Sequence, residues 1–201
     1  MGENKMMHGF FFEPKELRPV DNEKSPKLNE IENRPGYYKW WANKKDFRMI
    51  LSKLGADFDT IIRENVVECF DEFYCVYVGI AVKESVRSRI NWHVNDKHDK
   101  KRVEKGYLST LRQTISSIVA NNQLAKKETN DFIDRLKVEV FYSNYEINSI
   151  EAKTEIEKIE KDLIQAKLRV LNIRDNEHPS AQSMKKTLQK LRKESKAKAL
   201  E

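Results

Sequence analysis

The sequence predicts an α+β fold in which three short strands are flanked by helices. The segments 37–41, 74–81 and 136–142 are rich in aromatic and β-branched residues, as strands are. In the rest of the chain, apolar residues recur every three or four positions, which is the period of a helix with one buried face. With 201 residues, the chain is long enough for one domain with its own core.

The composition favours a cytoplasmic protein without a membrane segment. Charged residues make up 35% of the chain, and no apolar run approaches the roughly 20 residues that a membrane span needs. The cluster Phe10–Phe12 is cut off by Glu13 and Pro14 and is too short for the core of a signal peptide. We interpret Cys69 and Cys75 as reduced thiols, which fits a cytoplasmic location.

The net charge of +6 is concentrated near the C-terminus. From Lys185 onward, seven basic residues stand against two acidic ones. Basic segments of this kind either bind nucleic-acid phosphates without reading the base sequence or only keep a protein soluble. We therefore expect a basic, helical C-terminal tail at 177–201 after a central domain at 35–176. The preceding arm, residues 1–34, is mostly polar and shows no sustained period.

The chain turns at Arg34-Pro35-Gly36 and then enters the first strand. Side chains alternate along a strand, so Tyr38 and Trp40 point to the same face. A helical insert follows at about 43–73, and Gly55 is placed to end its first helix.

The strand 74–81 leads into a helix, and polar residues gather at the corner between them. Apolar residues at every fourth position of Val86–Val94 form the buried face of this helix. Arg89 and His93 lie one turn apart on the flank of that face. Because Tyr77 lies near the end of the strand, we expect these three side chains to converge.

A charged loop at 95–102 precedes a further helix at about 107–120, in which Arg112 falls within the apolar stripe. Arg112 is either an arginine whose stem passes the edge of the core or a phosphate contact. The candidates for nucleic-acid binding are four basic residues: Arg87, Arg112, Lys185 and Lys186.

The last core helix follows the third strand, and Asn148 with Glu151 forms a capping box at its start. Glu160 lies on the apolar side of this helix. A carboxylate in that position is costly unless a cation pairs with it. The cation is either Arg89 or a metal ion.

The order of these residues resembles the GIY-YIG nuclease family. The resemblance rests on Gly36-Tyr37-Tyr38, on Tyr77-Val78-Gly79, on an arginine within Val86–Ile90, and on Glu160 followed by Asn172. It covers about residues 35–176 and is strongest to a bacterial subgroup, restriction-enzyme-like or uncharacterised. It implies a small, mainly antiparallel sheet of three strands flanked by helices.

The resemblance also implies a set of site residues. The catalytic positions of the family fall on Tyr38, Tyr77, Arg89, His93 and Glu160. Glu160 matches the single metal-binding glutamate, and Asn172 matches an asparagine that supports the site. Arg169 stands where many members have proline, so we expect the last core helix to run on.

The activity implied is metal-dependent endonucleolytic cleavage of DNA. One Mg²⁺ or Mn²⁺ ion would be held by Glu160 and a phosphate oxygen, because magnesium keeps waters and accepts few protein ligands. Arg89 would stabilise charge on the phosphate, and Tyr38, through His93, would take a proton from the attacking water. Tyr77 would orient the water or the phosphate. The alternative is a catalytically inactive module that keeps the fold and binds nucleic acid or a protein; a homodimer would be needed to cut both strands at once.

Overall fold

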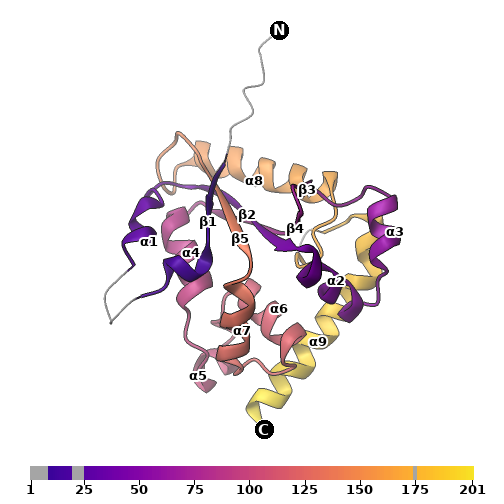
Figure 1. Cartoon of the computed structure of the whole chain (residues 1–201). Coiled ribbons are helices and arrows are strands. Elements are labelled where there is room, and N and C mark those ends of the chain that lie inside the picture. Colours follow the sequence, from indigo (N-terminus) through magenta and orange to yellow (C-terminus); the bar gives the residue numbers. More distant parts are fainter. Residues whose placement is uncertain (1–8, 20–24, 174–175) are drawn as a thin grey trace.

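The computed structural model of the chain describes residues 9–19, 25–173 and 176–201. In this part of the chain, one antiparallel sheet runs through the molecule, with its strands in the order β1-β5-β2-β4-β3 (Figure 1). The strands are β1 (Phe10–Phe12), β2 (Gly36–Asn43), β3 (Cys69–Phe70), β4 (Phe73–Ala81) and β5 (Lys137–Tyr142).

The sheet therefore has five strands among the described residues, where the sequence predicted three. The three expected strands are the central ones, β5, β2 and β4. The other two, β1 and β3, are edge strands of three and two residues, too short for an alternating pattern to stand out. Phe10–Phe12, which the sequence places in an arm, pairs with β5.

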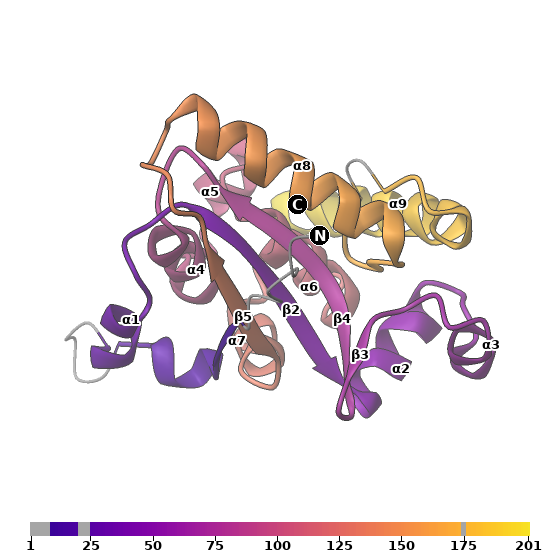
Figure 2. The same ribbon diagram turned by 90° about the horizontal axis from the view of Figure 1, so that it is seen from above.

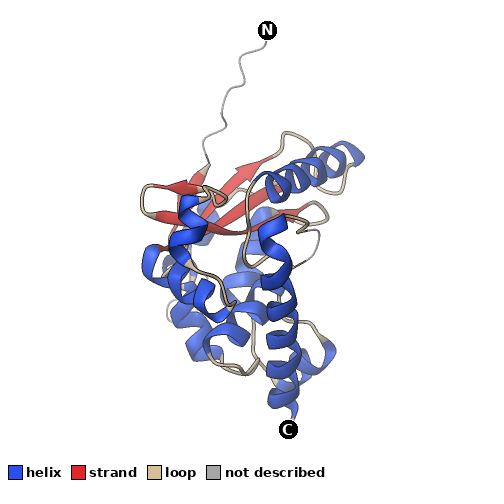
Figure 3. Ribbon diagram, turned by 90° about the vertical axis from the view of Figure 1, so that its right-hand side faces the viewer, coloured by secondary structure: helices blue, strands red, loops and turns tan. Residues whose placement is uncertain are grey.

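Helices cover both sides of this sheet. In chain order they are α1 (Pro26–Glu30), α2 (Lys44–Lys53), α3 (Phe58–Arg63), α4 (Val86–Asn95), α5 (Lys100–Lys105), α6 (Thr110–Val119), α7 (Lys126–Ile133), α8 (Ile150–Ala166) and α9 (Gln182–Leu200). Short 3₁₀ turns, η1 (Pro14–Leu17) and η2 (Pro179–Ala181), complete the set. Figure 3 shows the strands as one layer, with α8 above it and most of the helices below it. No helix in the described ranges has the length and apolar character needed to cross a membrane.

Local sequence sets several helix boundaries. Gly55, with φ of +74°, follows α2 as expected, because glycine adopts this left-handed conformation without strain. Ser149, rather than the expected Asn148, caps α8 by accepting a hydrogen bond from the Ala152 N–H. The expectation that α8 runs on past Arg169 is wrong, because the helix ends at Ala166.

The two faces of the sheet have different apolar clusters. The larger cluster contains Tyr38 and Trp40 of β2, and helices α4, α6 and α9 pack against it. A smaller cluster on the other face joins Trp41, Cys75 and Val78 to Ile164 of α8. α8 thus lies next to β4, as Figure 2 shows from above.

The C-terminal helix is part of this core, although the sequence set residues 177–201 apart as a tail. Met184 and Leu188 are buried in the main cluster, and Leu191 packs against it. Ser195 also donates or accepts a hydrogen bond with Ser117 of α6, at 2.5 Å. Most lysines of α9 are exposed. Because they dominate the composition of this segment, the apolar stripe is not obvious in the sequence.

Candidate active site

A cleft of about 570 Å³ opens between α4, α8 and the ends of β2 and β4. Its lining includes the five residues that the sequence singles out for catalysis: Tyr38, Tyr77, Arg89, His93 and Glu160. They come from four elements, β2, β4, α4 and α8, and together span more than a hundred residues of chain. The sheet brings the two tyrosines together, and the two helices bring the charged groups to them.

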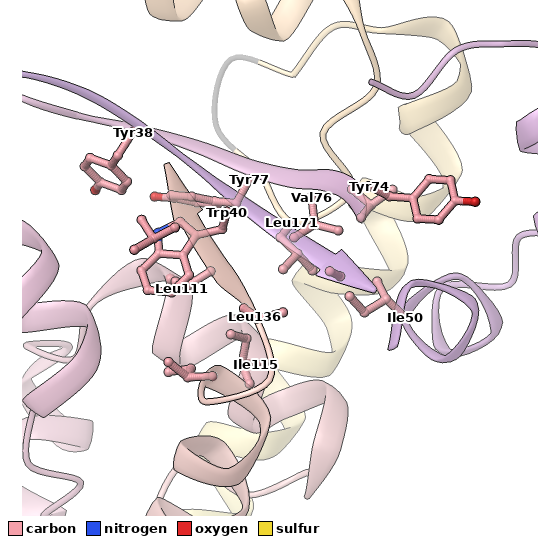
Figure 4. Packing of buried hydrophobic residues seen from close by; sticks show 14 of the residues in the cluster. Tyr38, Trp40, Ile50, Tyr74, Val76, Tyr77, Leu111, Ile115, Leu136 and Leu171 are labelled. Atoms are coloured by element: carbon pink, nitrogen blue, oxygen red, sulfur yellow. The ribbon is translucent and has the colours of Figure 1, made fainter. Parts of the chain in front are cut away.

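The pairing of β2 with β4 determines where Tyr77 points, and a β-bulge follows directly after it. Trp40 pairs with Tyr77 and Trp41 with Cys75, so Val76 is an extra residue on β4. Because of this extra residue, Val76 and Tyr77 both belong to the main cluster, whereas strict alternation would place them on opposite faces. Figure 4 shows the rings of Tyr38 and Tyr77 extending from their strands to the same side. Tyr77 pairs with Trp40, which shares a face of β2 with Tyr38, so the regular pairing before the bulge puts the Tyr77 phenol on the face that carries Tyr38. The bulge adds Val76 to the same face.

Tyr38 and His93 form a buried hydrogen-bonded pair. The Tyr38 Oη and His93 Nε2 atoms lie 2.6 Å apart, and both side chains are 2% exposed. Burial, with a smaller contribution from Arg89, lowers the pKa of His93 well below its usual value. Burial also raises the pKa of Tyr38 well above that of a free phenol. At neutral pH the phenol is therefore protonated and donates to the neutral imidazole.

The second motif glycine makes room for the Tyr38 ring. Gly79 lies opposite Tyr38 on the neighbouring strand. A Cβ at position 79 would stand 2.5 Å from Tyr38 Oη and 2.6 Å from the adjoining ring carbon. Gly36 is equally restricted, since its Cβ would lie 1.9 Å from the backbone oxygen of Phe141. Gly79 therefore makes room for the Tyr38 side chain, and Gly36 for the backbone of β5.

Arg89 is held at the mouth of the cleft by two neighbours. Its Nε lies 3.2 Å from Glu84 Oε1, and its guanidinium carbon lies 4.9 Å from the centre of the Trp92 ring. The side chain remains 30% exposed. A cation placed in this way is oriented by its neighbours and can still reach an anionic ligand.

Helix α8 presents one face to the cleft. Glu157, Glu160, Lys161 and Ile164 all line it, with the spacing of neighbours on a helix. The sequence placed Glu160 on the apolar side of the helix, against the core. In the structure it is half-buried and lines the cleft. Glu157 and Lys161 are not among the residues predicted from the sequence motifs, although the same helical spacing could have identified them.

Asn172 is fixed to the backbone of β4. Its Oδ1 accepts a hydrogen bond from the Val78 N–H at 2.9 Å, and its Nδ2 donates to the Val78 carbonyl at 2.8 Å. The preceding residue, Leu171, donates its N–H to the carbonyl of Val76 at the bulge. The segment after α8 thus satisfies the backbone groups beside Tyr77 that no neighbouring strand pairs.

The chemistry of the cleft fits a hydrated hard cation. Three glutamates line it, Glu157, Glu160 and Glu177, and carboxylate oxygens are the ligands that Mg²⁺ and Mn²⁺ prefer. In the described ranges, no three or more histidine, cysteine, aspartate or glutamate residues are grouped as a metal cage. A site with few protein ligands suits Mg²⁺, which keeps several waters.

Two of the four residues expected to contact nucleic acid, Arg112 and Arg87, instead donate hydrogen bonds to backbone carbonyls of the chain itself. Arg112 is 0% exposed and donates to the carbonyls of His93 and Val94, each at 2.9 Å. It therefore holds the C-terminal end of α4 and presents no surface to a phosphate. Arg87 donates to the carbonyl of Ile31 at 2.5 Å and so joins α1 to α4. These contacts favour a structural role for both arginines.

The other two expected contacts, Lys185 and Lys186, lie in the first two turns of α9. Lys186 is exposed and Lys185 half-buried. Neither residue lines the cleft.

Comparison with known proteins agrees with this arrangement. A family model described as "GIY-YIG catalytic domain" matches residues 36–194, a range that includes the cleft and most of α9. No curated protein and no solved structure matches the chain significantly.

Proposed function

The chain belongs to the GIY-YIG catalytic domain family, a family of nucleases, and on this premise we propose that it is a metal-dependent endonuclease that hydrolyses phosphodiester bonds in DNA. Glu160 holds the metal ion, one Mg²⁺ or Mn²⁺ per site. Tyr38, Tyr77, Arg89 and His93 act on the water and the phosphate.

One observation carries the proposal: the five side chains line a single cleft, and two of them are joined by a hydrogen bond of 2.6 Å. Phosphodiester hydrolysis needs an activated water, a fixed positive charge near the phosphate and a place for protons to go. A cleft lined by phenol, imidazole, guanidinium and carboxylate supplies each of these groups. A protein that no longer cleaved DNA would not need to keep all of these side chains.

Proton transfer begins at the Tyr38–His93 pair. As the water attacks phosphorus and the P–O bond to the departing strand breaks, one water proton passes to Tyr38 Oη, and the phenol proton passes to His93 Nε2. The departing oxygen takes a proton from solvent, to which His93 later returns one. Burial keeps the pKa of His93 low, so Nε2 is unprotonated and able to accept, and the charged imidazolium exists only for the duration of the transfer. The high pKa of Tyr38 means that the phenolate exists only transiently during the transfer.

Two positively charged groups stabilise the negative charge on the phosphate. The guanidinium of Arg89 faces the cleft and stabilises the negative charge that develops on the phosphate oxygens. When bound at Glu160, the divalent ion adds positive charge at the phosphate and lowers the pKa of a coordinated water.

Tyr77 has a different role from Tyr38. Burial, and secondly the negative charge of Glu160, raises the pKa of Tyr77 to about 12. The hydroxyl is therefore protonated at neutral pH and serves as a hydrogen-bond donor that orients the phosphate. Lys185 and Lys186 are proposed to contact the DNA backbone away from the cleft. Cleavage of both strands would require a homodimer, since the described part of the chain forms one such site.

The test is nicking of supercoiled plasmid DNA by the full chain. Cleavage is expected with Mg²⁺ or Mn²⁺, and EDTA should abolish it. Glu160→Gln should remove cleavage, whereas Asp162→Asn, an exposed carboxylate on the same helix outside the cleft, should not. DNA binding without nicking by the unmodified chain would instead support the inactive binding module.

A further inference from the structure

A second hollow, of about 560 Å³, lies beside the active-site cleft and shares Trp92 with it. The remaining lining comes from the α4–α5 connection, from α5 and from the turn after α5: Asp99, Lys101, Arg102, Gly106 and Tyr107. We call it the Tyr107 hollow. None of these residues takes part in the cleavage steps proposed above.

Two aromatic rings distinguish the Tyr107 hollow. Tyr107 is 59% exposed, and Trp92 is half-buried. A large ring left in water gains free energy when a flat apolar ligand covers it. Aromatic side chains are the usual partners on which unpaired nucleobases stack.

Backbone and side-chain contacts hold the segment that carries Tyr107 in place. Gly106 has φ of +69° and ends α5 in the left-handed conformation. The Tyr107 N–H donates to the Arg102 carbonyl at 2.8 Å. Arg102 in turn forms an ion pair of 2.6 Å with the buried carboxylate of Asp96. Since these groups are already ordered, a ligand would lose little free energy in fixing them.

The charges around the hollow suit an anionic ligand. Lys101 and Arg102 line it, and Lys105 Nζ lies 6.0 Å from the centre of the Tyr107 ring. The one acidic lining residue, Asp99, lies 3.7 Å from Arg102 Nε. Because Arg102 also pairs with Asp96, the exposed Lys101 and Lys105 carry the positive charge that is left for a ligand. Flat rings flanked by cations match the chemistry of a nucleotide, whose base is flat and whose phosphate is negative.

We propose that the Tyr107 hollow binds an unpaired nucleobase of the same strand whose phosphate lies in the cleft. The proposal rests on the proposed nuclease function, because the shared Trp92 places base and phosphate side by side. A base can enter such a pocket only after leaving the helical stack, which costs least in single-stranded or mismatched DNA. The enzyme is therefore expected to prefer DNA that is unpaired near the cut.

The experiment measures binding of the full chain to oligonucleotides in EDTA, where no cleavage occurs. Tyr107→Ala should weaken binding of single-stranded DNA by about 5-fold or more, the loss expected for one stacked base. Tyr107→Trp should restore binding, and binding of fully paired DNA should change little. The matched control is Tyr145→Ala, since Tyr145 is also exposed, at 46%, but lies outside the hollow. Equal affinities of the original chain and Tyr107→Ala for single-stranded DNA would overturn the proposal.

Fluorescence gives a second reading. Of the three tryptophans, Trp40 and Trp41 are buried at 0% and 2% exposure, so quenching by a single-stranded oligonucleotide reports on Trp92. Quenching is expected in the original chain and should be lost in Trp92→Phe; quenching that persists in this variant would count against stacking.

If plasmid is not nicked but the Tyr107 and Trp92 effects remain, the nuclease proposal fails and the base pocket stands. If plasmid is nicked and neither substitution matters, the reverse holds.

Discussion

The phenol of Tyr38 lies across the backbone of Gly79, so close that a Cβ on residue 79 would stand 2.5 Å from Tyr38 Oη. The two residues are cross-strand partners on β2 and β4. The same hydroxyl bonds His93 at 2.6 Å. The glycine of the second motif is thus a steric condition for the hydrogen bond on which proton transfer depends.

Gly79→Ala should therefore impair cleavage with limited effect on the fold. The new methyl group must push the Tyr38 ring away from His93, and a displacement of about 1 Å can cost roughly 100-fold in rate. The measurement is the single-turnover rate of plasmid nicking, with circular dichroism to monitor folding. In a Tyr38→Ala background, Gly79→Ala should add little further loss, because no ring remains to be displaced. A full additional loss there would show that Gly79 acts through something else.

Asn172→Ala should destabilise the domain. The side chain satisfies both the N–H and the carbonyl of Val78, and each buried group left unsatisfied costs about 1–3 kcal/mol. We expect the free energy of unfolding to fall by roughly 2–4 kcal/mol in urea titrations. Asn144→Ala, in the loop after β5, is the control and should change stability by less than about 1 kcal/mol. A similarly small change in Asn172→Ala would contradict a supporting role.

Lys186→Ala should weaken DNA binding to the same extent for every base sequence. An exposed lysine that contacts a phosphate contributes about one unit to the slope of log affinity against log salt concentration. The slope is measured between about 50 and 200 mM salt. Lys27→Ala, on α1 at the other side of the molecule (Figure 1), should leave the slope unchanged. Equal slopes for Lys186→Ala and the original chain would remove α9 from the DNA contacts at this position.

Acid should destabilise the protein partly through His98. Burial, and secondly Arg112, lowers the pKa of His98 to about 4, and its Nε2 accepts a hydrogen bond from Arg112 Nε at 2.7 Å. The unfolded chain takes up this proton below about pH 6.5, and the folded one only near pH 4. The free energy of unfolding therefore falls as pH decreases through this window, by up to roughly 3 kcal/mol from this group.

Urea titrations at pH 7 and pH 4.5 compare the original chain with His98→Gln. The amide keeps a donor and an acceptor but cannot titrate, so the variant should lose less stability on acidification. The comparison isolates His98, because the carboxylates and His93 titrate in both proteins. An identical loss in both would place the acid sensitivity elsewhere.

Much of the architecture follows from local patterns in the sequence. The central strands, the helix that carries Arg89 and His93, and the left-handed glycine after α2 all follow from periodicity and turn chemistry. The edge strands do not, because β1 and β3 are too short and exist only by pairing with β5 and β4. The apolar stripe of α9 is not obvious because lysines dominate the composition of this segment.

Details of the site depend on tertiary contacts that no local pattern carries. The bulge at Val76 is a matter of register between two strands, and it turns Val76 to the face that carries Tyr77. Arginine is most often found at protein surfaces, yet Arg112 is buried. Its guanidinium donates hydrogen bonds to backbone carbonyls at the end of α4. Sequence motifs therefore identify which residues gather in the cleft, while side-chain direction and burial require the fold.

The most direct test of a shared hydrolytic centre is the single-turnover nicking rate of Tyr38→Phe, Glu160→Gln and the double variant. Residues that act as one unit are strongly non-additive, so the double variant should be about as slow as the slower single variant, while all three still bind DNA. Losses that multiply in the double variant, or cleavage that survives both single substitutions, would contradict a common site for these residues.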